Sequence, residues 1–213
     1  MDKSRREALK FLSTSALIAS SALLFAGQIS QAATAPTITF FYSSKYGATK
    51  DTAHWISQGV TMPIHLVDIT DEKQVNIAFA TDSQYILGSA VYQDQPMQQM
   101  QDFVAKHQQS LNGNTLASFV VCGTQPTTEK NQQRIAGYLR KLSEPLTIKP
   151  QIEQQLGGRL VIANLQEKDR RMLTHFYSKV LKKPLVDWDR TDKETITKLA
   201  QRITAATHQN ALG

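Results

Sequence analysis

A polar joint between an apolar run and a helical pattern is the part of this sequence that best suits binding chemistry. The apolar run is Ile38–Tyr42, and the helical pattern begins at about Lys50. A helix N-terminus presents free backbone N–H groups and a partial positive charge, which favour an anion. The joint therefore predicts a phosphate-binding loop, or else an ordinary helix start capped by hydroxyl side chains. Its residues are Ser43, Ser44, Lys45, Tyr46, Gly47, Ala48 and Thr49.

The joint lacks the glycine patterns of two common nucleotide-binding loops. Neither G-x-G-x-x-G nor G-x-x-x-x-G-K-[ST] occurs there, which argues against a dinucleotide-binding fold and against an NTPase. The hydroxyl groups and the turn-forming Gly47 remain as the features that suit a phosphate. Lys45 adds positive charge to the loop, unless its side chain simply extends into solvent at the loop tip.

The first 35 of the 213 residues have the pattern of an export signal. A basic start is followed by an apolar stretch and by small residues that suit cleavage. Arg5 and Arg6 resemble a twin-arginine signal, although Ala8 departs from that motif. We expect residues 1–35 to engage the twin-arginine export machinery and to direct the chain to the periplasm. The alternatives are an ordinary signal peptide and an uncleaved anchor.

The remaining residues, 36–213, suit a single domain with a mild positive charge. The signal segment holds four of the 24 basic and two of the 18 acidic residues, which leaves 20 and 16 and a net charge of +4. No basic run is interleaved with aromatic residues, so nucleic-acid binding is not expected. Cys122 is the single cysteine, so no internal disulfide is possible, and no zinc-type Cys/His spacing occurs.

Apolar runs that favour strands alternate with patterns that favour helices. Most of the apolar runs are continuous, which is typical of strands covered by helices on both faces. The alternation predicts an α/β fold with a doubly wound parallel sheet, and the region 166–190 fits no simple element. The predicted strands are 36–42, 62–69, 83–90, 115–123 and 158–165, and the predicted helices are 47–58, 95–109, 128–142 and 193–207.

The polar joint resembles the loop T/S-x-T-G-x-T that holds the phosphate of FMN in flavodoxin-like proteins. Ser44, Gly47 and Thr49 match this pattern, whereas Tyr46 stands where a threonine is common. The likeness spans about residues 37–206. It implies FMN as the cofactor and a five-stranded parallel sheet of order 2-1-3-4-5 with helices on both faces.

The resemblance also implies two loops beside the flavin ring. Tyr92 is the candidate for stacking on the ring, or else an ordinary rim tyrosine. Because the hydride chemistry belongs to the cofactor, no catalytic residue and no metal ligand is predicted. The first loop is Ser89, Ala90, Val91 and Tyr92, and the second is Gly123, Thr124 and Gln125.

Within this fold, the chain resembles the bacterial menaquinone-dependent protoporphyrinogen oxidases. The segments YILGSAVY, GGRLVIANL and VDWDRTDKETITKLAQRI follow that family's layout. Val91-Tyr92-Gln93 replaces an Arg-Tyr pair, and residues 166–169 replace an aromatic and basic stretch. The resemblance implies an FMN oxidoreductase that passes electrons to a quinone, and the two departures leave the porphyrinogen substrate open.

Residues 170–183 combine Arg and Lys with large apolar side chains. Such a basic amphipathic segment suits a membrane surface, a quinone or a partner protein, or it packs as a short helix on its own domain. Two other functions stay open for the whole chain. It is either an electron-transfer protein without a small-molecule substrate of its own, or a flavodoxin-fold domain that has lost FMN.

Overall fold

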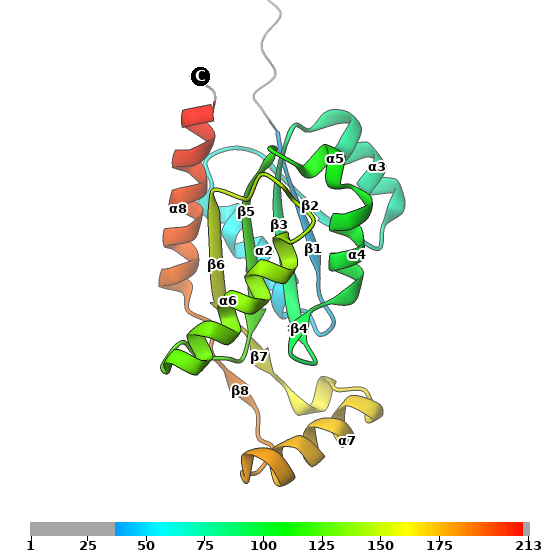
Figure 1. Cartoon of the computed structure of the whole chain (residues 1–213), viewed down its shortest axis with the longest axis vertical. Coiled ribbons are helices and arrows are strands. Elements are labelled where there is room, and N and C mark those ends of the chain that lie inside the picture. Colours follow the sequence, from blue (N-terminus) through cyan, green and yellow to red (C-terminus); the bar gives the residue numbers. More distant parts are fainter. Residues whose placement is uncertain (1–36, 211–213) are drawn as a thin grey trace, which may run out of the picture. The chain divides into compact units, whose positions relative to one another are not determined.

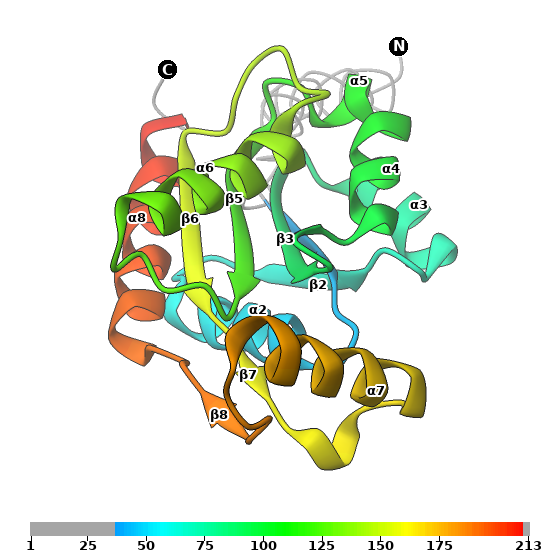
Figure 2. The same ribbon diagram turned by 60° about the horizontal axis from the view of Figure 1, so that its bottom comes forward.

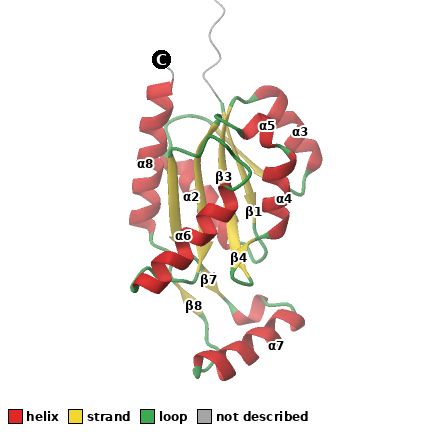
Figure 3. Cartoon of the chain, viewed as in Figure 1, coloured by secondary structure: helices red, strands yellow, loops and turns green. Residues whose placement is uncertain are grey.

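The computed structural model describes residues 37–210 (Figures 1 and 3), so the predicted export signal lies outside the described residues. Five parallel strands form the main sheet in the order β2-β1-β3-β5-β6, which confirms the predicted doubly wound topology. A short strand, β4 (Gln95–Pro96), pairs antiparallel with the end of β3. The parallel strands are β1 (Ile38–Ser43), β2 (Ile64–Asp68), β3 (Gln84–Tyr92), β5 (Thr115–Cys122) and β6 (Ile152–Gly157).

Helices cover both faces of the sheet, and consecutive phenylalanines of β1 serve the two cores. Phe40 packs with α2 and α8 on one face, whereas Phe41 packs with helices of the other face. Both side chains are fully buried, because neighbouring strand residues point to opposite sides of a sheet. The helices are α2 (Ala48–Gly59), α3 (Glu72–Thr81), α4 (Gln98–Lys106), α5 (Gln108–Leu111), α6 (Glu129–Ser143) and α8 (Lys193–Asn210).

The strand register brings the three predicted loops to one edge of the sheet. Ser43 at the end of β1 pairs with Ser89 of β3, and Ala90 pairs with Val121 of β5. The carboxyl ends of β1, β3 and β5 are therefore neighbours. In open α/β sheets this edge is where ligands bind.

The fifth parallel strand is not where the sequence predicted it. The prediction was 158–165, but the strand is β6, and the apolar residues after Gly158 leave the sheet. As the outer strand beside β5, it buries only Ile152 and Leu156, and the residues between them are polar or half-exposed. A strand of this kind lacks the continuous apolar run that marks the central strands. Helix α3 was also not predicted.

Residues 158–190, which lie between β6 and α8, form a lobe that is called the insert below. Its stem is an antiparallel ribbon of β7 (Arg159–Leu160) and β8 (Trp188–Asp189). Beyond the stem lie a 3-10 turn (Ile162–Asn164), α7 (Glu167–His175) and a π-helical turn (Phe176–Leu181). Figure 2 shows α7 lying across the carboxyl ends of the strands. The insert therefore faces the edge where the three predicted loops meet.

Candidate functional site

The joint between β1 and α2 has the local geometry of an anion site. Gly47 caps α2 with a φ of 87°, a left-handed conformation that a glycine adopts without strain, and no side chain caps this helix end. Within the described residues, Ser44 Oγ and Thr49 Oγ1 are buried hydroxyls without a hydrogen-bond partner. Buried polar atoms are nearly always paired. In the described part of the chain the hydroxyls of Ser118 and Thr204 lack a partner as well, so Ser44 and Thr49 are distinguished by lying together at a helix N-terminus, where both are available to donate to an anion.

Ser43 and Ser89 use their hydroxyls inside the fold. Their Oγ atoms lie 3.3 Å apart between β1 and β3, and both residues are buried. Ser89 Oγ also accepts a hydrogen bond from the Met97 backbone N–H at 3.0 Å and donates to the Ala90 carbonyl at 2.9 Å. These contacts tie the last residues of β3, which include Val91, and the Met97 backbone that follows β4 to the end of β1.

Three side chains of the predicted loops converge on a carboxylate of the insert that the sequence did not single out. Asp169 of α7 pairs with Lys45 Nζ at 2.6 Å and accepts hydrogen bonds from the hydroxyls of Tyr46 and Tyr92, the latter at 2.5 Å. The Lys45 ammonium also lies 3.9 Å from the centre of the Tyr92 ring, a cation–π contact. We call Lys45, Tyr46, Tyr92 and Asp169 the Asp169 cluster.

The electrostatics of the cluster favour a charged carboxylate. Burial of Asp169, which is 1% exposed, would raise its pKa, but hydrogen bonds from Lys45, Tyr46 and Tyr92 outweigh burial and lower the pKa to about 2. Burial and the bond to the carboxylate raise the pKa of Tyr46. Asp169 is therefore an anion at every physiological pH.

A second cation, Arg159 of β7, lies beside the predicted phosphate loop. Its guanidinium nitrogen would lie 3.8 Å from a Cβ placed on Gly47, and it forms an ion pair with Asp51 in the first turn of α2. Lys45 and Arg159 thus bring two positive charges to residues 44–49, each balanced by a carboxylate of the chain. A cavity of about 20 Å³ is lined by Tyr46, Arg159, Leu160, Val161, Asn164 and Leu165.

Trp188 of the insert packs on the second predicted loop. Its indole would lie 2.6 Å from a Cβ at Gly123, so the ring approaches this backbone closely because no side chain intervenes. The indole N–H donates to the Tyr177 hydroxyl at 2.9 Å, and the Arg190 guanidinium lies 4.7 Å from the ring centre. Thr124, which follows, is half-buried, and Gln125 is exposed. Trp188 therefore adds an aromatic ring at a loop predicted to approach the flavin.

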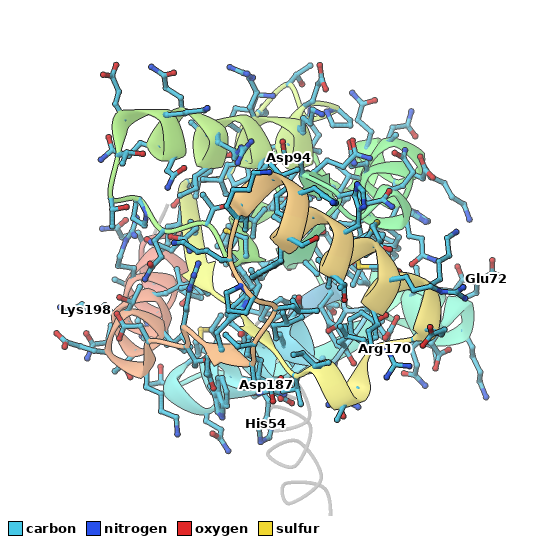
Figure 4. The ribbon with its side chains drawn as sticks, turned by 90° about the horizontal axis from the view of Figure 1, so that it is seen from below. His54, Glu72, Asp94, Arg170, Asp187 and Lys198 are labelled. Atoms are coloured by element: carbon cyan, nitrogen blue, oxygen red, sulfur yellow. The ribbon has the colours of Figure 1, made fainter. Side chains whose placement is uncertain are left out.

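The arrangement at this edge fits the phosphate end of FMN better than its ring. Residues 44–49 offer two hydroxyls that have no partner in the part of the chain that the structure describes, a helix N-terminus and nearby cations. Figure 4, seen onto this edge, shows α7 lying over the strand ends, and Lys45 already lies against the Tyr92 ring. A larger cavity of about 310 Å³ lies elsewhere, between α3 and α4, where it is lined by Val75 and Phe103 among others.

Comparisons with known proteins agree with this architecture. No curated protein sequence matches the chain significantly. A metal-soaked flavodiiron core from Synechocystis sp. is similar with 12% identity and a TM-score of 0.50, over 84% of this chain and 37% of that one, so the chain spans well under half of that protein.

Two smaller solved structures are also similar. Oxidised flavodoxin 1 from Bacillus cereus has 15% identity and a TM-score of 0.47, over 79% of this chain and 97% of that one. A flavodoxin, WrbA-like protein from Agrobacterium tumefaciens has 16% identity and a TM-score of 0.46, over 82% and 98%. The family described as the flavodoxin domain matches residues 39–184, which is more than half of the chain. The chain therefore belongs to the flavodoxin domain family.

Proposed function

We propose that this chain is an FMN-binding oxidoreductase of the flavodoxin type. The observation that carries the proposal is the pair of buried hydroxyls, on Ser44 and Thr49, that lack a partner within the described residues beside a helix N-terminus. A phosphate ester accepts hydrogen bonds from hydroxyl and amide donors, so residues 44–49 fit that end of FMN. FMN binding is also typical of the flavodoxin domain family.

Each part of the site then has a role. Ser44 and Thr49 hold the phosphate, and Lys45 and Arg159 supply positive charge beside it. Tyr92 offers an aromatic face to the ring, and the insert keeps water away from this edge of the sheet. When bound, FMN supplies hydride and electron transfer.

The specific reaction that we propose is a protoporphyrinogen dehydrogenase-like oxidation with a quinone as electron acceptor. Its support is the resemblance in sequence layout, including the long insert after the fifth strand. An exported electron-transfer protein without its own substrate is the alternative within the same fold. A domain that has lost FMN is the second candidate, and the Asp169 carboxylate that already engages Lys45, Tyr46 and Tyr92 favours it.

The absorption spectrum of the freshly isolated protein, residues 36–213, tests the proposal. We expect flavin absorption and one FMN per chain, or uptake of one added FMN by colourless protein. Anaerobic incubation with protoporphyrinogen and a quinone then separates the enzyme from a carrier, because an enzyme produces fluorescent protoporphyrin and a carrier does not. Colourless protein that takes up no FMN would leave only the flavin-free domain.

The exposed side of the insert supports a proposed contact with an anionic membrane surface. Phe176, Val180 and Leu181 are 41%, 62% and 42% exposed, among the lysines at 179, 182 and 183. Among the described residues, no helix is long and apolar enough to cross a bilayer. Apolar side chains ringed by lysines suit the headgroup region of anionic lipids. Together with the proposed export signal, this supports our proposal that the protein acts in the periplasm, at a membrane surface.

Replacing Val180 by Asp is expected to weaken binding to anionic vesicles at least fivefold. The substitution removes an apolar side chain that the lipid would bury, and the new carboxylate is repelled by the negative lipid headgroups. Ile148→Asp is the matched control, since Ile148 is 59% exposed but lies outside the insert. Sedimentation with phosphatidylglycerol vesicles and with neutral phosphatidylcholine vesicles measures the effect. Equal binding of the two variants to anionic vesicles would show that the insert does not contact the membrane.

A further inference from the structure

Helix α7 and its N-cap residue contact the loops at the sheet edge through residues spaced three apart. The Gln166 backbone N–H donates to the Tyr46 hydroxyl at 3.3 Å, and Met172 Sδ accepts from the Gln93 side chain at 3.5 Å. Asp169 lies between them and makes the contacts of the Asp169 cluster. This spacing puts the side chains of Asp169 and Met172 on one side of α7, whereas Gln166 is the N-cap residue and makes its contact through the backbone. Asp169 supplies the ionic contact of that face.

The Asp169 cluster also covers one face of the Tyr92 ring. The Lys45 ammonium lies 3.9 Å from the ring centre, and the same ammonium is 2.6 Å from Asp169. The Tyr92 hydroxyl is bound to the other oxygen of that carboxylate. A flat ring can stack on this face of Tyr92 only after Lys45 has moved. Lys45 is held in place by a buried anion.

We propose that Asp169 is a latch that holds the insert closed over the phosphate loop and keeps Lys45 on the Tyr92 ring, so that flavin entry requires the latch to open. This inference rests on the proposed function only for its second half, the entry of FMN. Asp169 acts through Lys45 and Tyr92, and is therefore a positioning residue.

The fold supplies the means for such an opening. The insert joins the domain through the two-residue ribbon of β7 and β8, and its ends leave β6 and enter α8. The phosphate of FMN and the Asp169 carboxylate are both anions that bind the same ammonium, so the ligand can replace the latch at Lys45. Once Lys45 turns to the phosphate, the face of Tyr92 is free for the ring.

Asp169→Asn tests the latch, with Glu167→Gln as its matched control. Both changes remove one negative charge from the same turn of α7, but Glu167 is exposed and pairs with Arg170 and Arg171 of its own helix. Lys45→Met removes the opposite partner as a second variant. Hydrogen exchange of the flavin-free protein measures opening of the insert. Stopped-flow fluorescence measures the rate of FMN association.

We expect Asp169→Asn and Lys45→Met to raise amide exchange in α7 about tenfold or more, the scale of one lost charge-assisted hydrogen bond. Glu167→Gln should match the wild type. Asp169→Asn should also bind FMN about tenfold faster, which loss of a merely structural contact would not produce. Unchanged exchange in α7, or faster exchange with slower FMN association, overturns the latch. If no variant binds FMN, the proposed function fails, and the exchange data alone decide whether the latch exists.

Discussion

Replacing Ser44 by Ala and Thr49 by Val in one chain is expected to weaken FMN binding about 100-fold, at about 1.5 kcal/mol for each hydrogen bond lost to a charged group. Binding of riboflavin, which has no phosphate, should not change. The free energy of unfolding of the flavin-free protein should stay the same or rise, because two buried hydroxyls without a partner are removed. Fluorescence titration and urea unfolding measure the two quantities.

Thr52→Val is the matched control for this prediction. Thr52 is buried on α2, the helix that also contains Thr49. Its hydroxyl already donates a hydrogen bond to the Ala48 carbonyl at 2.9 Å, so it is not available to a phosphate. Its loss should leave the FMN affinity unchanged. An equal loss of affinity for FMN and riboflavin in the double variant would show that the loop does not hold a phosphate.

Replacing Gly157 by Ala is expected to lower the free energy of unfolding by about 3 kcal/mol, at the upper end of the usual cost of overpacking. Gly157 ends β6 at the base of the insert. A Cβ there would lie 1.8 Å from the backbone oxygen of Arg190, and a backbone atom cannot move aside as a flexible side chain does. The insert should shift as well, so hydrogen exchange in β7 and β8 should rise.

Gly137→Ala is expected to change the free energy of unfolding in the opposite direction. Gly137 lies inside α6, and a Cβ there meets nothing within 4 Å. Alanine in a helix interior should therefore raise the free energy of unfolding by about 0.5–1 kcal/mol. Urea unfolding of both variants checks the pair. Equal effects at the two glycines would contradict the close packing of the insert stem on β6.

The central part of the fold could be read from the sequence because its signals are local. The apolar runs of β1, β3 and β5 are buried on both faces, and Phe40 and Phe41 show why they are continuous. The outer strand β6 has no such run, since it buries only Ile152 and Leu156. The predicted fifth strand, 158–165, was therefore wrong, because its apolar residues belong to the insert.

The residues of the candidate site also fall into those that the sequence predicted and those that it did not. Residues 43–49 follow one another in sequence, so their pattern predicts the loop directly. Asp169 meets Tyr46 across 123 positions, and Trp188 reaches Gly123 from the far side of the insert. Nothing in the sequence near either residue states which loop it contacts, because tertiary packing alone brings them together. The sequence offered two signals for the insert, a region 166–190 that fits no simple element and the basic amphipathic segment 170–183, and neither identifies the loop that the insert contacts.

Nuclear magnetic resonance of the labelled protein during titration with FMN tests the central claim most directly, because it locates the phosphate residue by residue. We expect saturation at one FMN per chain, with the largest shifts at the backbone amides of residues 44–49. Titration with riboflavin should perturb these amides much less. Shifts that gather instead around Val75 and Phe103, at the cavity between α3 and α4, or no saturable shift at all, would contradict the account.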